Sequence, residues 1–467
     1  MAPRVAAYLY ALLVAAAVGH FLLGIPIQLT DSYGNMVKLA TPWGDLLVGE
    51  FTQRAYLRPL LWAELKLVYE ASGGNYFAWF RGVHVVQILA LVLLYTGLVR
   101  PRTWRDAAIL PLGLAALIGM HTFLGTVSEA FPINTFLTVV LCCLAAANLA
   151  LMDHRWWVDV LAALLFVVAA LTVESGLLVG VIFIGAALAG ARGVSRPGLA
   201  VVVALLAGYF VLRFGVLSVG SPGLMERSSG YGFRTLEPPE LMARFGDNPL
   251  WFYAYNVVSS VLTVLVSEPR GGVFRLVYGI TVADPEPSAI VNVIASVCGT
   301  AMIGAYAWRR RRAWLARAFD RDDRLVLLFG MVLAANAAIS YPYTKDVIMS
   351  PAGAFYAVAV FAAARGVLPG AGVPRHALRT AAVAAACAVL AVTWSIRSAA
   401  LHLNLREAAR KVRVEWAYVD DWFASQNATV ENPRELALLR RLQREALYDR
   451  PGPPRLPLAD HRLFDVD

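Results

Sequence analysis

Acidic and basic residues stand at the ends of several long apolar runs, where their chemistry would suit transfer of a group from a phosphate-linked donor. Asp31 follows the first apolar run, and Arg58 lies later in the same loop, 28–80. A carboxylate can accept the proton of an attacking hydroxyl, and fixed cations stabilise the negative charge that grows on a departing phosphate. Asp31 is therefore the candidate general base, and Arg58 and Lys345 are the candidate phosphate ligands.

Other polar stretches supply the remaining candidates. Glu129 lies in GTVSEAFP, Glu174 lies at a hairpin tip, and YPYTKDVIMSP follows a late apolar run. Asp31 and Glu129 could together hold a divalent cation against a phosphate, although no denser ligand cluster demands one, so a metal is left open. The candidate catalytic residues are Asp31 and Glu129, and the candidate substrate-binding residues are Arg58, Lys345, Tyr343, Glu174 and Asp346.

Each of these residues also has a structural interpretation. A lone acid after a first span is often only a polar helix end, and Arg58 could anchor a surface helix to lipid headgroups. Lys345 beside Asp346 could form a simple ion pair in a loop. Residue type alone does not distinguish the catalytic from the structural interpretation. The answer depends on the elements that position these residues.

The composition places the candidates in a membrane protein. The chain of 467 residues is 59% hydrophobic and only 16% charged, with a mean hydropathy of +0.60. We expect an all-α polytopic fold, because runs of roughly 20 apolar residues cross a bilayer as helices. The first run is typical of a retained anchor, since no small-residue cleavage site follows it. The twelve apolar runs are 5–27, 83–99, 107–125, 132–152, 156–173, 176–191, 198–217, 250–267, 288–308, 325–341, 352–368 and 379–396.

Cysteine usage and net charge exclude several classes of protein. Cys142, Cys143, Cys298 and Cys387 all fall within apolar runs, which predicts packing residues rather than disulfides or a metal site. The net charge of +9 comes mostly from arginines in short loops, and indicates membrane topology rather than nucleic-acid binding. The sequence has no internal repeat and no glycine-rich phosphate loop, which argues against an ATP-driven pump.

The arginine-rich loops predict which ends of the spans share a side. Such loops should be cytoplasmic, which puts the amino terminus inside and Asp31 outside. Simple alternation of twelve spans would nevertheless place the densest cluster, 309–324, outside. We therefore expect eleven or thirteen crossings: either 250–267 lies along the membrane or re-enters it, or a short crossing lies near 272–283. The inner arginines are Arg100, Arg102, Arg105, Arg155, Arg192, Arg196, those of 309–324, Arg365, Arg375 and Arg379.

The outer loop and the tail differ from the spans. Residues 58–70 place Leu61, Leu65 and Val68 on one helical face, which predicts a short helix at the bilayer surface. Pro59 suits its first turn. We divide the chain into a membrane module, 1–400, and a short helical tail, 401–467, which we expect on the outer side as a helical cap, a surface-lying arm or a flexible end.

The order of these features resembles the GT-C superfamily of membrane glycosyltransferases. The nearest resemblance is to the transmembrane O-mannosyltransferases that carry tetratricopeptide repeats, and to their bacterial relatives. It covers about residues 1–400, although Ser32 stands where relatives often have a second acid and the tail is too short for a repeat array. The matching segments are Thr30-Asp31-Ser32, Arg58-Pro59-Leu60, Ser128-Glu129-Ala130-Phe131, Val173-Glu174-Ser175, Asp247-Asn248-Pro249-Leu250 and Thr344–Gly353.

The residues and the resemblance together predict a membrane glycosyltransferase. It would transfer a hexose or pentose from a polyprenyl-phosphate donor to an acceptor hydroxyl, with inversion, at the outer face of a bacterial inner membrane. The expected partners are the donor lipid, membrane lipids and a glycan, lipid or protein acceptor, without nucleic acid. Two alternatives stay open: a lipid or glycolipid transporter or flippase, and a catalytically inactive scaffold of the same fold.

Overall fold

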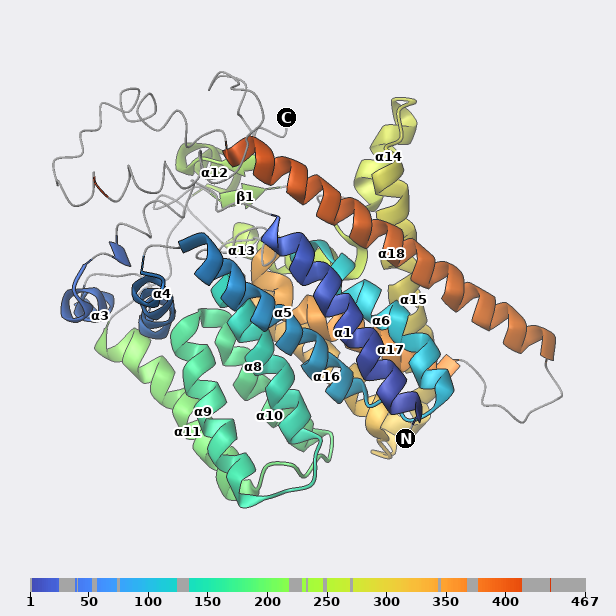
Figure 1. The fold of residues 1–467 in the computed structure, drawn as a ribbon, viewed down its shortest axis with the longest axis horizontal. Helices are drawn as coiled ribbons and strands as arrows, with labels where there is room; N and C mark the ends of the chain where they lie inside the picture. The colour runs from blue at the N-terminus through green and yellow to red at the C-terminus, as the bar shows by residue number, and fades with distance from the viewer. Residues whose placement is uncertain are drawn as a thin grey trace.

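The computed structural model is almost entirely helical (Figure 1). All twelve apolar runs form helices, which confirms the prediction of a helical membrane fold. The only strands among the described residues are two of three residues each, paired antiparallel with Gly230 opposite Thr235. The structure describes residues 2–24, 38–39, 41–52, 57–73, 76–123, 134–217, 229–231, 234–246, 250–268, 272–342, 346–367, 377–413 and 437.

Helices make up nearly all the elements of the described residues. The long helices are α1 (Ala2–Leu23), α5 (Tyr76–Val99), α6 (Trp104–Gly119), α8 (Asn134–Ala150), α9 (Trp156–Thr172), α10 (Leu178–Leu188), α11 (Arg196–Phe210), α13 (Leu250–Val266), α15 (Pro287–Leu315), α16 (Arg321–Ile339), α17 (Ser350–Val367) and α18 (Ala377–Arg413). The shorter elements are α3 (Trp43–Thr52), α4 (Pro59–Ala71), α12 (Pro238–Phe245), α14 (Val273–Thr281), 3-10 helices at His121–Phe123, Glu174–Leu177 and Asp346–Met349, a π-helical turn at Val211–Val216, β1 (Ser229–Tyr231) and β2 (Arg234–Leu236).

Several of these helices are long and apolar enough to cross a membrane. Large apolar side chains such as Leu13 and Val392 point outward on them, 68% and 58% exposed, as expected of lipid-facing surfaces. The chain is therefore an integral, multi-pass membrane protein. Among the described residues the six qualifying segments are Ala2–Leu23, Ala78–Val99, Arg196–Val216, Pro287–Leu315, Asp346–Val367 and Ala384–Leu403, and three shorter apolar helices are Thr135–Ala150, Trp156–Thr172 and Glu174–Leu188.

Helix α17 lies at the centre of the bundle. Every residue from Ser350 to Ala364 is buried, and the helix packs against α5, α6, α8, α15 and α16. Its many alanines let neighbouring backbones approach closely, which is how membrane helices gain packing energy where lipid offers no hydrophobic driving force. Tyrosine hydroxyls cross these contacts: Tyr95 donates to the carbonyl of Ala357 at 3.0 Å, and Tyr356 donates to that of Ser296 at 2.9 Å.

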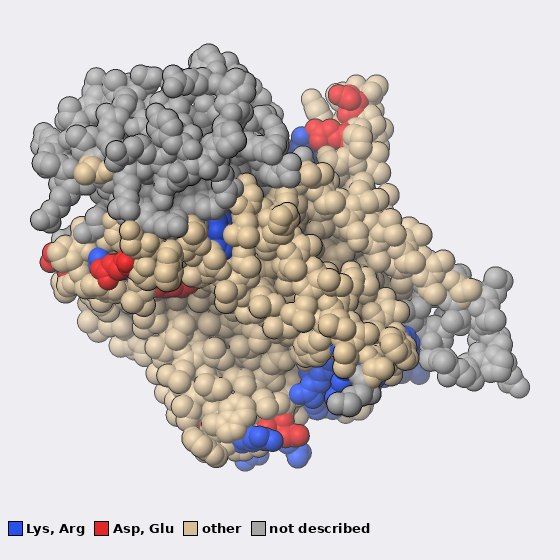
Figure 2. Space-filling model, in the orientation of Figure 1, with Lys and Arg blue, Asp and Glu red and all other residues tan. Residues whose placement is uncertain are grey.

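Arginines from several loops meet at one end of the bundle, as the charge pattern predicts. Arg321 donates to the carbonyls of Leu98 and Leu151, at 2.8 and 3.1 Å, and Arg365 donates to that of Val99 at 2.9 Å. These bonds join α16 and α17 to the carboxyl-terminal ends of α5 and α8. The largest basic patches in Figure 2 lie at this end, below flanks that are almost uncharged. We call it the arginine end.

Helix α13 does not reach the arginine end. Asn256 donates to the carbonyl of Tyr341 at 2.8 Å, beside the opposite end of α16, whereas Thr300 in the middle of α15 donates to the carbonyl of Leu265 at 2.5 Å. The helix is bent by 102° from α12. The carboxyl end of α13 therefore lies beside the middle of α15. A pair bent in this way is either a broken span or a re-entrant segment, so the expected number of crossings stays a prediction.

A buried arginine holds the tip of α13. Arg397 of α18 is 1% exposed and donates to Ser267 Oγ at 3.0 Å, just beyond α13, and to the carbonyl of Asn292 at 3.3 Å. It also lies 3.1 Å from His121 Nδ1 and stacks on Trp394. Within the part of the chain that is described, Arg397 makes no ion pair. The negative end of the α13 dipole faces it instead.

The proposed division at residue 400 falls inside α18, which continues without a break to Arg413. The tail beyond residue 413, apart from residue 437, lies outside the described residues, as does most of the loop that carries Asp31.

The close helix contacts predict a measurable difference between two glycine substitutions. A Cβ at Gly113 would collide with the Tyr95 hydroxyl, whereas a Cβ at Gly330 meets nothing within 4 Å. We expect Gly113→Ala to lower the free energy of unfolding by about 1–3 kcal/mol. Gly330→Ala should be neutral or stabilising by up to about 1 kcal/mol.

Thermal unfolding of both variants in one detergent tests this. Adding Tyr95→Phe to Gly113→Ala removes the colliding oxygen and should recover part of the loss. Equal melting temperatures for the two glycine variants would contradict the packing described.

Candidate functional site

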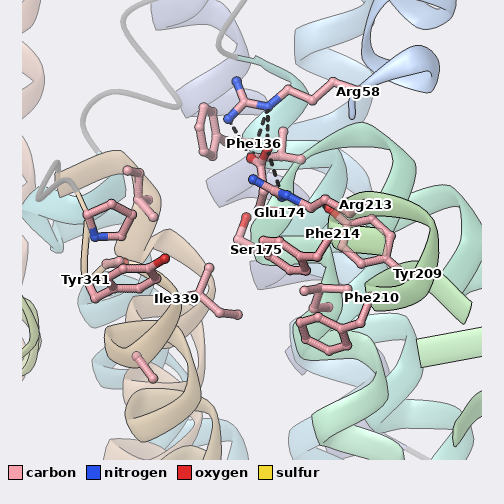
Figure 3. Close-up of a pocket in the computed structure, with 16 residues that line it drawn as sticks. Arg58, Phe136, Glu174, Ser175, Tyr209, Phe210, Arg213, Phe214, Ile339 and Tyr341 are labelled. Atoms are coloured by element: carbon pink, nitrogen blue, oxygen red, sulfur yellow. Dashed lines mark hydrogen bonds and ion pairs between the residues drawn. The ribbon is translucent and has the colours of Figure 1, made fainter. Parts of the chain in front are cut away.

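A cavity of about 340 Å³ lies between α11 and α16, at the end of the bundle opposite the arginine end. Its walls include five aromatic side chains: Phe136 from α8, Tyr209 and Phe210 from α11, Phe214 from the π-helical turn and Tyr341 after α16. Figure 3 shows the α11 side chains facing Ile339 and Tyr341 across the open space. The two walls come from segments more than a hundred residues apart, so only the tertiary fold creates the cavity.

Two arginines share one carboxylate at the edge of this cavity. Arg58 donates two hydrogen bonds to Glu174 Oε2, from Nε at 3.0 Å and from Nη2 at 2.5 Å. Arg213 Nη1 lies 3.3 Å from Glu174 Oε1. The Glu174 side chain is only 14% exposed and that of Arg213 12%. Figure 3 shows the two guanidinium groups on either side of the carboxylate. We call these three residues the Arg–Glu–Arg cluster.

The backbone around Glu174 explains its position. Helix α9 ends at Thr172, Val173 is extended, and Glu174 begins the 3-10 helix that leads into α10. The hairpin is so tight that a Cβ at Gly176 would overlap the backbone of Ala169. Glycine at this position therefore lets the chain reverse and places the carboxylate at the bundle end.

The two arginines reach Glu174 from different elements. Arg58 occupies the position before α4, with Pro59 in the first turn, as predicted for a helix over 58–70. Arg213 lies in the π-helical turn Val211–Val216 that extends α11, where it also donates to the Tyr209 hydroxyl at 2.9 Å. Single π-turns within α-helices are frequent at functional sites, because they re-aim side chains.

Polar side chains fix α4, and through it Arg58. Lys66 is buried and donates to the carbonyls of Leu39 and Thr41, at 2.9 and 2.8 Å. Glu64 accepts from the Thr138 hydroxyl of α8 at 2.9 Å. The sequence pattern predicts that Glu64 and Lys66 point away from the apolar face of this helix. In the structure both side chains form hydrogen bonds with other parts of the protein.

Within the described residues, the two guanidinium groups of the Arg–Glu–Arg cluster contact one carboxylate. All three residues line the cavity, and the Arg58 side chain is 27% exposed. A guanidinium group carries several N–H donors in a planar fork that matches the oxygen atoms of carboxylate and phosphate. The arrangement therefore suits a phosphate or carboxylate ligand.

The structure brings two of the seven candidate site residues together, and four others lie outside the described residues. Arg58 and Glu174 form the cluster just described. Asp346 begins the 3-10 helix Asp346–Met349, but is not among the residues that line the cavity, although its neighbour Ile348 is. The candidates outside the described residues, whose roles remain predictions, are Asp31, Glu129, Tyr343 and Lys345.

Sequence reasoning missed Arg213. It is the single charged residue in the apolar run 198–217. An ionisable residue within a candidate span is a functional candidate by default, because placing a charge in hydrocarbon is costly. That rule would have found Arg213, although it would not have named Glu174 as the partner.

Metal ligands and cysteines add little to the site. The described part of the chain has no group of three or more metal-binding side chains, and the pair Asp31 and Glu129 lies outside it. Cys142 and Cys143 are buried, as expected of packing residues. The expectation is wrong for Cys298, which is exposed on the flank of α15.

The fold and the cavity define a helical multi-pass membrane protein with a pocket lined by two arginines, one glutamate and five aromatic side chains, at the end opposite its arginine-rich loops. No family model, curated protein or solved structure matches the chain.

The buried cluster predicts a strong effect of Glu174→Gln. Removing the carboxylate leaves two adjacent guanidinium groups without their counter-charge, and breaking a buried pair in this way costs about 3–5 kcal/mol. Glu286 is the matched control, since it pairs with Arg275 at 2.5 Å but with side chains 47% and 38% exposed. Glu286→Gln should change stability by less than about 1 kcal/mol. Similar melting temperatures for both variants would show that the cluster is not a structural ion pair.

Glu64 predicts a pH-dependent stability. Burial raises the pKa of Glu64 to about 7, against the opposing hydrogen bond from Thr138. The folded state then binds the Glu64 proton more tightly than the unfolded state does. The free energy of unfolding should therefore fall as the pH rises from about 4.5 to about 7, and be level above that.

Glu64→Gln should abolish this component. The stability of the variant relative to the wild type should rise across the same pH interval, by on the order of 1–3 kcal/mol. Melting temperatures of both proteins from pH 4 to 9 measure the difference. A difference that does not vary with pH would rule out a raised pKa.

Proposed function

We propose that this protein is a membrane glycosyltransferase that uses a polyprenyl-phosphate-linked sugar as donor. The observation that carries the proposal is that the guanidinium groups of Arg58 and Arg213 line the same cavity as five aromatic side chains. A prenyl-phosphate donor is an anion joined to a long apolar chain. Both halves of such a molecule match features of the cavity, whereas a water-soluble nucleotide sugar would have no use for its apolar wall.

The phosphate would lie against Arg58 and Arg213. Both arginines line the cavity, with side chains 27% and 12% exposed, and charge-assisted hydrogen bonds to phosphate are the strong ones. Phe210 and Phe214 are 45% and 47% exposed on the outer flank of α11. The first isoprene units would pack against these rings, so the lipid need not leave the hydrocarbon region.

A GT-C-like topology follows from the same proposal. Eleven helices would cross the membrane, namely α1, α5, α6, α8, α9, α10, α11, α15, α16, α17 and α18, with α13 re-entrant. An odd number puts the arginine end in the cytoplasm together with the amino terminus, in accordance with the positive-inside rule. The cavity then opens at the outer face of a bacterial inner membrane.

The reaction proposed is a single inverting displacement. The acceptor hydroxyl oxygen attacks the anomeric carbon while the bond from that carbon to the phosphate oxygen breaks. Asp31 takes the hydroxyl proton late in the step, when the sugar carbon carries positive charge. The arginines stabilise the charge that moves onto the departing prenyl phosphate. Asp31 and Glu129 could also hold a divalent cation at this phosphate.

The donor reaction tests the proposal directly. Purified protein in nanodiscs is supplied with polyprenyl-phosphate sugar and a pool of glycan, lipid and protein acceptors, and release of prenyl phosphate is measured. Asp31→Asn should reduce turnover at least a hundred-fold while leaving donor binding intact. Arg213→Gln should weaken donor binding at least ten-fold. Asp153→Asn and Arg275→Gln, which change charges away from the cavity, should behave as the wild type does.

Three outcomes would contradict the proposal. Near-normal turnover in Asp31→Asn would remove that residue from the role of base. Donor that crosses the bilayer intact would favour a flippase, and donor that binds without cleavage across the whole acceptor pool would favour an inactive scaffold.

A further inference from the structure

Helix α15 is longer than the core of a bilayer requires, and its surplus length is basic. Its 29 residues extend about 43 Å at 1.5 Å per residue, whereas the hydrocarbon core is roughly 30 Å thick. The apolar run 288–308 accounts for the crossing. The last turns of the helix, from Arg309 to Leu315, therefore lie at the level of the lipid headgroups, at the arginine end.

Some arginines at this end are already engaged within the protein. Arg310 pairs with Asp320 and Asp323, at 2.8 and 2.6 Å, and Arg365 pairs with Asp322. These three aspartates are the acidic residues of the segment that joins α15 to the first turn of α16. Their carboxylates are thus occupied by Arg310 and Arg365, and the same segment has no further acid for the other arginines of α15.

The other arginines of α15 lie on its surface. Arg309, Arg311 and Arg312 are exposed, and none of them makes an ion pair with any part of the chain that the structure describes. Arg311 donates to the carbonyl of Trp308 on its own helix at 2.6 Å, and its guanidinium carbon lies 3.9 Å from the centre of the Trp308 ring. Three positive charges therefore stand together at the end of a span.

Two of these arginines share a helical face with two large apolar side chains. Trp308, Arg311, Arg312 and Leu315 are spaced i, i+3, i+4 and i+7, which places them on one side of α15. Trp308 is 68% exposed and Leu315 is 85% exposed. We call these four residues the basic face of α15. It offers apolar contact next to guanidinium groups, whose planar fork of donors matches a phosphate.

We propose that the basic face of α15 binds the headgroup of an anionic phospholipid. The phosphate accepts hydrogen bonds from Arg311 and Arg312, and the glycerol backbone packs against Trp308. A bilayer lipid is the occupant because the face continues directly from a membrane span, and because arginines in this position are attracted to anionic headgroups. Tryptophan is also the side chain typical of this depth in a membrane. The proposal is independent of the transferase activity.

Lipid titration followed by native mass spectrometry tests the basic face. The full-length protein in detergent is titrated with phosphatidylglycerol, which has a net negative charge, or with phosphatidylcholine, which has none. We expect the first phosphatidylglycerol to bind at least ten-fold more tightly than phosphatidylcholine. A phosphatidylglycerol with a diazirine next to its headgroup should label the peptide that contains residues 308–315.

Matched variants separate this face from the general charge of the arginine end. Arg311→Gln combined with Arg312→Gln should weaken phosphatidylglycerol binding at least ten-fold, because each arginine contributes about five-fold at an anionic surface. Phosphatidylcholine binding and the melting temperature should not change.

The control pair removes the same charge from another part of the same end. Arg192 and Arg196 are exposed where α10 leads into α11, next to the Ala189 carbonyl that accepts from Arg324 at 3.0 Å. Arg192→Gln combined with Arg196→Gln should change phosphatidylglycerol binding less than about two-fold, since neither residue lies on the basic face. Arg311→Lys combined with Arg312→Lys keeps the charge and should retain part of the affinity.

Four results would overturn the proposal. Equal affinities for the two lipids, or an equal effect of the control pair, would show that α15 has no headgroup site of its own. Displacement of phosphatidylglycerol by excess inorganic phosphate would indicate a site for free anions. A soluble polyglutamate peptide that binds the face as tightly as the lipid does would make it a docking surface for an acidic protein. Sugar transfer enters none of these measurements, so their failure is distinct from a failure of the proposed function.

Discussion

The structure depends on one constraint: backbone polar groups that enter hydrocarbon must be hydrogen-bonded within the chain. The constraint makes every apolar run a helix and moves charge to the helix ends. At the arginine end, Arg321 and Arg365 donate hydrogen bonds to backbone carbonyls at the carboxyl ends of α5 and α8. Cations placed at helix carboxyl termini are also favoured by the helix dipole. Topology and helix capping are thus served by the same residues.

The opposite end of the bundle uses the same physics for a different result. Arg58, Glu174 and Arg213 come from three elements and meet at the edge of the cavity. Their charged groups line the same space as five aromatic side chains, so one ligand could contact both charge and apolar surface there. At the arginine end, Arg365 instead pairs with Asp322 and donates to a helix carbonyl.

Arg397 illustrates how one buried cation joins segments that are distant in the sequence. It lies on α18 and donates to Ser267, just beyond α13, and to the carbonyl of Asn292 in α15. The carboxyl end of α13 is thereby held beside the middle of α15, where Thr300 donates to the carbonyl of Leu265.

The sequence by itself determined the helical membrane class, all twelve helical runs, the short helix that begins at Pro59 and the meeting of the arginine loops at one end. These follow from local apolarity and charge, which act within one span or its flanks. Only the tertiary structure decided that Arg213 joins Arg58 on Glu174, that α13 ends beside the middle of α15 and that Cys298 faces outward. Such features depend on which helix faces lie together, and hydropathy in a span that is apolar all round does not encode its orientation.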